Sequence, residues 1–211
     1  MKPRLVAIEG PIGVGKTALA RRLARHWEAR LTLEPTDNPF LESFYRDRRG
    51  SSFSAQIWFL LARHRQQRDI RQGDLFQQAV VEDYLFEKDL IFAYLNLNDV
   101  ELSTYEKLYN LLAPEVVRPD LVIYLQARVP ALLKRIGERA RDVEKRLSEA
   151  YLDEVVQAYD YFFFRYDQTP LLVVDTNEIN PAREDADFDD LVKQIEKMER
   201  GGVEYYRPRS S

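Results

Sequence analysis

Five short runs of apolar residues recur along the chain and predict the strands of one sheet. They cover residues 5–9, 31–34, 79–83, 121–126 and 171–175. Each run is continuous rather than alternating between apolar and polar positions, which is typical of strands that are buried on both faces of a parallel sheet. The pattern therefore predicts a five-stranded parallel sheet.

The longer segments between these runs place apolar residues at helical spacing. In segment 16–30, Leu19, Leu23 and Trp27 fall on one face, at positions i, i+4 and i+8. The same spacing predicts helices over 53–72, 85–112, 131–139, 148–165 and 186–200, and the long 85–112 segment is expected to break near 96–98. This alternation of strands and helices predicts an α/β fold, with helices flanking the sheet and right-handed crossovers.

The sequence indicates a single domain. We find neither an internal repeat nor a Gly/Ser-rich linker, so we expect one domain over residues 1–200. Gly201 and Gly202 are expected to end the last helix, and residues 201–211 are expected to form a C-terminal tail. The sequence leaves open whether this tail packs on its own domain, reaches a neighbouring molecule or is disordered.

The amino-acid composition excludes several kinds of chemistry and of binding partner. The chain has 211 residues and no cysteine, which excludes disulfides, thiolate nucleophiles and cysteine-ligated metals. With only two histidines, His26 and His64, we do not expect a histidine-rich metal site. The net charge of −4 gives no overall attraction to nucleic acid, so we expect no nucleic-acid partner. We recognise neither a signal peptide nor a membrane-spanning stretch, and therefore expect a cytoplasmic protein without a membrane partner.

One motif carries specific chemistry. The phosphate-loop pattern G-x-x-x-x-G-K-[ST] is matched by Gly10, Pro11, Ile12, Gly13, Val14, Gly15, Lys16 and Thr17. The motif follows a predicted buried strand and precedes a predicted amphipathic helix, which is the required context. Glycines let backbone N–H groups turn toward a phosphate, and the helix N-terminus adds partial positive charge. We expect Lys16 to reach the β- and γ-phosphates of ATP and Thr17 to hold Mg²⁺.

The motif leaves the fate of the γ-phosphoryl group open. A GTPase would need a base-reading motif of the N-K-x-D type, which we do not find, and a mechanical ATPase is usually longer. A small kinase fits if an acceptor site exists. Glu34 follows the second predicted strand, where α/β enzymes bind ligands, and could act as the general base for a hydroxyl. A solvated carboxylate at the end of a strand would look the same.

Several further segments form a recognisable series along the chain: Glu34-Pro35, 38–41, 44–45, 53–63, 83–86 with 88–89, 119–125, an arginine cluster at 135–141, and 151–152. Taken in this order, they resemble the deoxyribonucleoside kinase family, most of all its bacterial deoxyadenosine/deoxyguanosine kinase branch. The resemblance covers about residues 4 to 180. It implies a phosphate-loop kinase fold with an arginine-rich lid at about 137–147.

The resemblance also implies roles on the acceptor side. Glu34 matches the base for the nucleoside 5′-hydroxyl, and Tyr45 with Glu144 matches the pair that holds the sugar 3′-hydroxyl. Gln56 matches the glutamine that bonds the base edge, and Arg63 an arginine beside the base. The alternatives are that Gln56 and Arg63 are surface residues of a helix and that Tyr45 is an aromatic residue of the core.

On the donor side, Arg135, Arg139 and Arg141 match the lid arginines over the phosphates, with Arg139 and Arg141 binding ATP and Arg135 and Arg139 assisting catalysis. Arg135 and Arg139 are four residues apart on one helical face, where like charges repel unless an anion binds. An ordinary salt-bridged helix end with Glu138 and its acidic neighbours is the alternative.

The chain departs from the family pattern at two positions. Animal members carry an arginine that contacts the transferred phosphate where this chain has Asp83, so that role is vacant or is filled from the lid. Glu82 or Asp83 could order Mg²⁺ through water, and Asp83 also counts as a substrate-binding candidate. Lys88 stands where several relatives place an aspartate over the base, so it counts as a substrate-binding candidate and the base preference cannot be copied. A solvated helix lysine is the alternative for Lys88.

The resulting hypothesis is a kinase that moves the γ-phosphoryl of ATP to the 5′-hydroxyl of a deoxyribonucleoside, with a purine favoured, in deoxynucleotide salvage. Two alternatives remain: a nucleoside-monophosphate kinase of the thymidylate type, whose anionic acceptor Glu34 would repel, and a non-catalytic ATP-binding switch. The 85–112 segment carries more apolar residues than one core-facing stripe needs. Relatives bury such helices in a homodimer, and we expect the same here.

Overall fold

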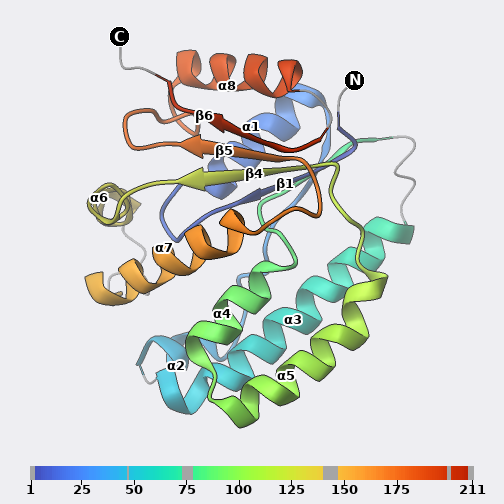
Figure 1. Ribbon diagram of the computed structural model, residues 1–211, viewed down its shortest axis with the longest axis vertical. Helices are drawn as coiled ribbons and strands as arrows, with labels where there is room; N and C mark the ends of the chain where they lie inside the picture. Colours follow the sequence, from blue (N-terminus) through green and yellow to red (C-terminus); the bar gives the residue numbers. More distant parts are fainter. Residues whose placement is uncertain (1–2, 47, 73–77, 140–146, 199–200, 209–211) are drawn as a thin grey trace.

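The computed structural model describes residues 3–46, 48–72, 78–139, 147–198 and 201–208, apart from the side chains of residues 45, 48, 49 and 139. Six parallel strands form one sheet in the order β2-β3-β1-β4-β5-β6 (Figure 1). They are β1 Leu5–Glu9, β2 Arg30–Thr32, β3 Val80–Glu82, β4 Leu121–Gln126, β5 Leu171–Asp175 and β6 Val203–Tyr206. The α/β fold and its five predicted strands are confirmed.

The number of strands was predicted wrongly, because β6 lies in the segment expected to be a tail. Gly201 and Gly202 both have positive φ and turn the chain back, and Gly202 accepts a hydrogen bond from the N–H of Leu171. Along β6, exposed residues alternate with half-buried ones, and Tyr206 packs against the main core. An edge strand of this kind has no continuous apolar run, which is why the pattern used for the other five strands missed it.

The helices account for most of the remaining chain. They are α1 Lys16–Trp27, α2 Leu41–Arg46, α3 Arg48–Gln72, α4 Lys88–Asn96, α5 Asp99–Leu112, α6 Val129–Arg139, α7 Glu149–Phe164 and α8 Asp185–Lys197, with one 3₁₀ turn, η1, at Ala113–Glu115. The break between α4 and α5 is confirmed. Asn98 starts α5 by accepting hydrogen bonds from two backbone N–H groups, and the Glu101 carboxylate accepts one from the N–H of Asn98 in return.

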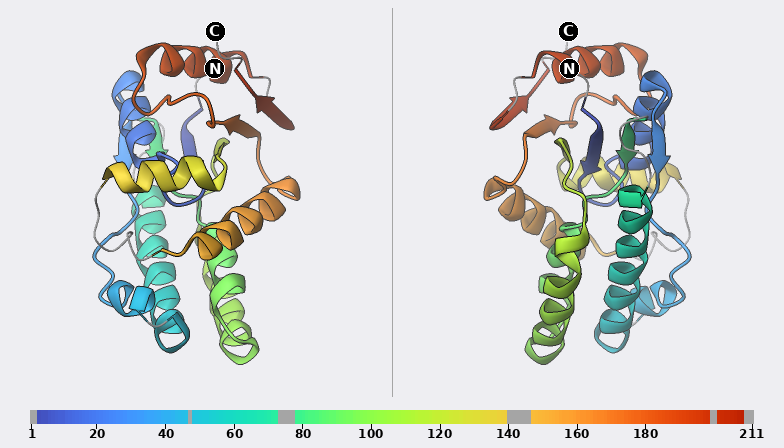
Figure 2. Two further views of the ribbon diagram at one scale, coloured as in Figure 1. Left: turned by 90° about the vertical axis from the view of Figure 1, so that its left-hand side faces the viewer. Right: turned by 90° about the vertical axis from the view of Figure 1, so that its right-hand side faces the viewer.

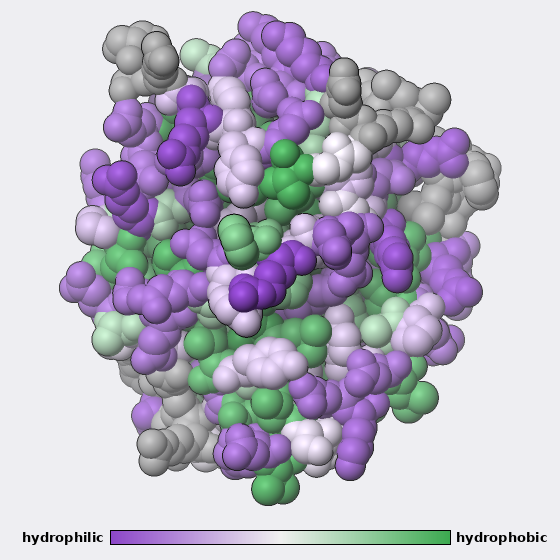
Figure 3. Space-filling model, viewed as in Figure 1, coloured by the Kyte–Doolittle hydropathy of each residue, from purple (hydrophilic) through white to green (hydrophobic). Residues whose placement is uncertain are grey.

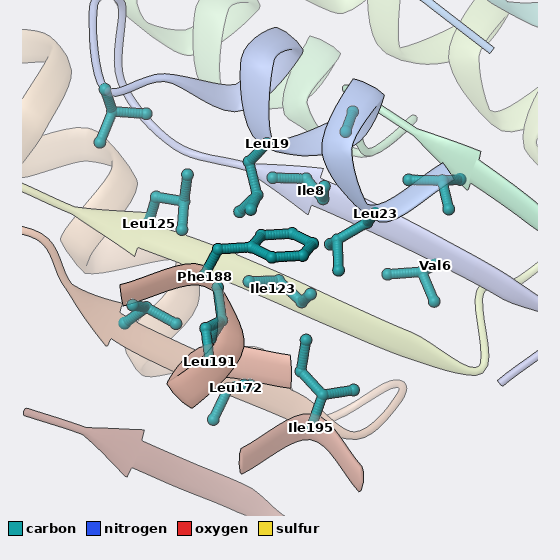
Figure 4. Close-up of a cluster of buried hydrophobic side chains, with 14 of the residues drawn as sticks. Val6, Ile8, Leu19, Leu23, Ile123, Leu125, Leu172, Phe188, Leu191 and Ile195 are labelled. Atoms are coloured by element: carbon teal, nitrogen blue, oxygen red, sulfur yellow. The ribbon is translucent and has the colours of Figure 1, made fainter. Parts of the chain in front are cut away.

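Two hydrophobic layers cover the two faces of the sheet. On one face, α1 and α8 pack against alternate residues of the central strands, and Phe188 lies among Leu19, Leu23 and Ile123 (Figure 4). On the other face, α7 and the adjoining α4 pack against the intervening strand residues, including Tyr124. Because both faces are covered, the strands are apolar almost throughout.

A third cluster joins α3, α4 and α5 into a helical lobe beyond the sheet (Figure 2). Leu60, Phe86, Tyr105 and Tyr109 form its buried centre. Within the described ranges, no helix combines the length and apolar character needed to cross a membrane. The lobe is joined to the sheet by the segments that follow β2 and β3, and the candidate site lies at this junction.

Candidate active site

The phosphate loop is shaped by glycines that no larger residue could replace. Gly13 has a φ of 87°, and a Cβ atom there would lie 2.6 Å from Cγ1 of Ile136 on α6. A Cβ atom at Gly10 would lie 2.4 Å from the Leu125 carbonyl oxygen of β4. The loop therefore passes directly against β4 and α6 before it enters α1. Its backbone and the N-terminus of α1 have the geometry that suits an anion at this end of the sheet.

Lys16 lies at the start of α1, with its ammonium group turned toward the loop. Its Nζ donates to the carbonyl oxygens of Gly10, at 2.6 Å, and Pro11, at 3.2 Å, and lies 4.0 Å from the Glu9 carboxylate. Burial lowers the pKa of Lys16, and the charge of Glu9 partly opposes this effect. An anionic phosphate in the loop would stabilise the charged form of Lys16 further.

Asp83 connects three segments that are far apart in the sequence. Its carboxylate accepts a hydrogen bond from the Thr17 hydroxyl at 2.6 Å and another from the backbone N–H of Glu34 at 2.5 Å. Asp83 follows β3 directly, whereas Thr17 belongs to the phosphate loop and Glu34 to the loop after β2. One buried carboxylate therefore fixes the predicted base relative to the predicted metal-binding hydroxyl.

Two buried cations flank the Glu34 carboxylate. Lys88 Nζ lies 2.8 Å from Glu34 Oε1, and the guanidinium of Arg63 donates to the same oxygen. Arg63 also donates to the buried carboxylate of Asp89 and lies over the ring of Phe59. Burial alone would raise the pKa of Glu34, but the charges of Lys88 and Arg63 outweigh it and hold the pKa well below its ordinary value. Glu34 is therefore ionised at neutral pH.

Glu82 and Asp83 are neighbours in sequence but point to different surroundings. Asp83 faces Thr17, whereas the Glu82 carboxylate accepts a hydrogen bond from Gln67 Nε2 of α3 at 2.7 Å. Burial is the main reason that the pKa of Glu82 rises to about 8. Of the two predicted metal-binding candidates, Asp83 is the one whose carboxylate adjoins the phosphate loop.

Glu82→Gln is expected to flatten the pH dependence of stability. Because the pKa of Glu82 rises from 4.5 to about 8 on folding, its protonation stabilises the fold fully below pH 4.5. This stabilisation is lost as the pH rises through about 8. One pKa unit corresponds to about 1.4 kcal/mol, so the loss amounts to a few kcal/mol. Denaturant unfolding of both proteins at pH 5 and pH 8 measures the difference. Equal pH dependence in the two proteins would contradict the expectation.

Gln56 and Arg63 lie two turns apart on one face of α3, and both are buried. The surface interpretation of these two residues is therefore wrong. Gln56 is 4% exposed, and its amide makes no hydrogen bond with another residue of the described ranges. Nearby, Asn38 donates through Nδ2 to the carbonyl oxygen of Ala55 and fixes the turn before α2. An unpaired amide on a buried face suits a partner with both donor and acceptor atoms.

Arg135 connects α6 to two loops at the phosphate end of the sheet. Its guanidinium donates to the Thr176 hydroxyl at 3.0 Å, to the Ile179 carbonyl oxygen at 3.3 Å and to the Val14 carbonyl oxygen at 3.5 Å. The residue is half-buried, and burial lowers the pKa of its guanidinium. These contacts hold α6 against the phosphate loop. Contact with ATP phosphates stays a prediction for Arg135.

The side chains of the remaining predicted site residues lie outside the described part of the structure. Tyr45 lies in α2 and Arg139 ends α6, but the structure does not describe their side chains. Arg141 and Glu144 belong to segment 140–146, which contains most of the predicted lid and lies outside the described residues. Their roles in binding ATP and the sugar stay predictions.

Sequence reasoning missed Glu9. This last residue of β1 is fully buried and accepts hydrogen bonds from the N–H of Gly10, the N–H of Leu85 and the hydroxyl of Tyr159. Its carboxylate lies 4.0 Å from the ammonium groups of both Lys16 and Lys88. An acidic residue that ends an otherwise apolar central strand was the available signal, since a buried carboxylate needs partners.

Known proteins match this architecture. A profile of the deoxynucleoside kinase family matches residues 6–199. A deoxyguanosine kinase from Bacillus subtilis is 32% identical over 199 residues, which is 92% of this chain and 96% of that protein. A deoxyadenosine kinase from Dictyostelium discoideum is 37% identical over 161 residues, covering 74% of this chain and 65% of that protein.

The fold matches as well. A solved structure of deoxyadenosine kinase from M. mycoides, with dCMP and dCDP bound, covers 92% of this chain and 100% of its own. Its TM-score is 0.79 and its sequence identity 24%. The chain therefore belongs to the deoxynucleoside kinase family, as its motifs indicated, and it is an ATP-dependent kinase that phosphorylates deoxynucleosides.

Proposed function

We propose that the chain transfers the γ-phosphoryl of ATP to the 5′-hydroxyl of a purine deoxyribonucleoside, deoxyadenosine or deoxyguanosine, in deoxynucleotide salvage. One observation carries the proposal: Asp83 links the phosphate-loop hydroxyl of Thr17 to the backbone of Glu34, which puts a donor site and a carboxylate base side by side. The purine preference is supported by relatives whose names specify deoxyguanosine or deoxyadenosine.

The donor side is expected to hold ATP together with Mg²⁺. The Thr17 hydroxyl donates its hydrogen to Asp83, so its oxygen keeps a lone pair for a metal, and Asp83 offers carboxylate oxygen at the same place. Oxygen ligands of this kind suit Mg²⁺, which keeps several waters and binds through one or two protein groups and the substrate phosphates. Among the described residues, no group of three or more His, Asp or Glu side chains could hold a metal ion. When bound, Mg²⁺ neutralises charge on the phosphate oxygens.

Side chains of the protein are expected to bind the phosphates and to accept the hydroxyl proton during the transfer. Lys16 is expected to leave the loop carbonyls and bind the β- and γ-phosphates, while Glu34 accepts the proton of the attacking hydroxyl. Because Lys88 and Arg63 both contact Oε1 of Glu34, Oε2 is the oxygen expected to receive the hydroxyl. Gln56 is expected to read the base edge. Arginines of the lid, Arg139 and Arg141, are expected to close over the donor phosphates and exclude water.

A steady-state panel tests this function against the two alternatives. Deoxyadenosine, deoxyguanosine, deoxycytidine and thymidine, each with its 5′-monophosphate, are assayed with Mg·ATP for kcat/KM. We expect the purine deoxynucleosides to give the highest values and the monophosphates to be poor acceptors, because a phosphate dianion would face the Glu34 carboxylate. Higher kcat/KM with the monophosphates would favour a nucleoside-monophosphate kinase. Transfer to none of these acceptors would favour an ATP-binding switch.

We further propose that the enzyme is a cytoplasmic homodimer that pairs through α4 and α7. Apolar residues gather over α4 (Figure 3), and aromatic side chains of both helices are exposed: Tyr94 by 61%, Tyr161 by 64% and Phe164 by 80%. Exposed aromatic side chains on two packed helices are typical of an association surface. We expect a dimer in sedimentation at micromolar concentration, and a monomer there would contradict the proposal.

A further inference from the structure

Lys88 places a buried positive charge beside the proposed catalytic base. It is the first residue of α4, where the partial positive charge of the helix N-terminus disfavours a cation. It is also buried, at 4% exposure, and the removal of an ammonium group from water is costly unless a partner compensates. Both costs fall on a residue whose charged end lies 2.8 Å from the proposed catalytic base. The Glu34 carboxylate compensates the buried ammonium, and the pair holds a positive charge next to the oxygen that receives the hydroxyl proton.

We propose that Lys88 is a catalytic residue whose ammonium group binds the phosphoryl group during its transfer to the hydroxyl held by Glu34. This inference rests on the proposed function, because it places a phosphoryl acceptor at Glu34. It assigns to α4 a contact with the reacting group rather than with the nucleoside base.

The two cations beside Glu34 differ in how firmly they are held. The Arg63 guanidinium lies between the carboxylates of Glu34 and Asp89 and packs over Phe59, so its planar fork is fixed on both sides. Lys88 has three donors on a flexible stem. Its ammonium is 2.8 Å from Glu34, and its other carboxylate contact, with Glu9, is 4.0 Å away. Lys88 therefore has donors to spare for a third anionic group.

The distances allow the contact. A hydroxyl oxygen hydrogen-bonded to Oε2 of Glu34 lies about 2.7 Å from that oxygen, and because the two carboxylate oxygens are about 2.2 Å apart, it lies within roughly 8 Å of the Lys88 ammonium, which contacts Oε1. The phosphorus that bonds to that hydroxyl brings its equatorial oxygens into the remaining gap. The flexible stem of Lys88 lets its ammonium turn toward one of them and donate a hydrogen bond.

Proton transfer to Glu34 changes the charge of the cluster in favour of this contact. Lys16, Arg63 and Lys88 face the carboxylates of Glu9, Glu34, Asp83 and Asp89, so the described groups have one more negative than positive charge when all are ionised. During the transfer, the 5′-oxygen bonds to the γ-phosphorus, the bond from that phosphorus to the bridging oxygen breaks, and ADP leaves with that oxygen. The hydroxyl proton passes to Glu34. The ammonium of Lys88 then loses its anionic partner just as negative charge arrives on the phosphoryl oxygens.

The test compares Lys88→Met, which removes the charge, and Lys88→Arg, which keeps it, with Lys107→Met on the exposed side of α5 as a matched control. We expect Lys88→Met to lower the single-turnover rate of transfer by about 10²–10³-fold, and Lys88→Arg to recover part of it. Deoxynucleoside affinity without ATP should change little in either. Lys107→Met should match the wild type.

A second measurement separates a catalytic role from a structural one. ADP with aluminium fluoride and deoxynucleoside mimics the transferring phosphoryl group, and Lys88→Met should weaken this ternary complex far more than it weakens deoxynucleoside alone. If Lys88→Met does not fold, Lys88→Gln takes its place. Unchanged transfer rates, or equal losses in both binding measurements, would overturn the role of Lys88. Failure of the proposed function would look different, because the wild type itself would then phosphorylate no deoxynucleoside.

Discussion

Glu34→Gln is expected to lower kcat by about 10²–10⁴-fold, with little change in deoxynucleoside affinity. Glutamine keeps the shape of the side chain, and its Oε1 can still accept a hydrogen bond from Lys88 or Arg63. It cannot accept the proton of the attacking hydroxyl, and it removes the negative charge that the two cations share. The loss should therefore appear in the chemical step rather than in binding.

Single-turnover phosphoryl transfer with Mg·ATP and deoxyguanosine measures this effect, because product release does not mask the chemical step. Glu196→Gln, on the exposed side of α8, is the matched control for the same chemical change. A transfer rate in Glu34→Gln equal to that of the wild type would remove Glu34 from the mechanism.

Asp83→Asn is expected to lower kcat by about 10²–10³-fold and to raise the Mg²⁺ concentration needed for half-maximal activity. The Asp83 carboxylate accepts from both the Thr17 hydroxyl and the N–H of Glu34. An asparagine amide has only one oxygen, so its NH₂ group would have to face one of these two donors. Whichever way the amide turns, the substitution therefore removes one of the two hydrogen bonds that connect the metal-binding hydroxyl of Thr17 to the base Glu34.

Titration of activity against Mg²⁺ at saturating ATP and deoxynucleoside measures this second effect. Asp69→Asn, an exposed position on α3, makes the same chemical change away from the site. If the Mg²⁺ requirement of Asp83→Asn matches that of the wild type, Asp83 has no part in metal binding, and its role is limited to holding the loop after β2.

Much of the fold could be predicted because most of its strands and helices show a clear pattern of apolar residues. The five buried strands are apolar throughout, and the break between α4 and α5 has a capping residue at Asn98. Helix α3 was harder to delimit. Its buried face combines Gln56, Arg63 and Gln67 with the apolar Leu60 and Ile70, and a mixed face of this kind weakens the periodic signal. Helix α2 is only six residues long and was not predicted.

How well the site could be predicted depended on whether its residues are neighbours in the sequence. The phosphate loop is a continuous motif, and so Lys16 and Thr17 could be assigned from neighbouring residues. The cluster around Glu34 joins residues from the loop after β2, from α3 and from α4, and no sequence spacing relates them. The resemblance to a family pointed to Glu34, Arg63 and Lys88 one at a time. It gave no indication that both cations contact the same carboxylate oxygen.

The strand order has a consequence for how the enzyme is made. Strand β3 lies between β2 and β1, so the first two strands to leave the ribosome have no direct pairing with each other. That half of the sheet can close only after residue 82 has been synthesised, when β3 inserts between them. Asp83 follows immediately and bonds to both Thr17 and Glu34. In a nascent chain, the insertion of β3 therefore both closes this half of the sheet and joins Thr17 to Glu34, and β4, β5 and β6 then extend the sheet from β1 in the order of their synthesis.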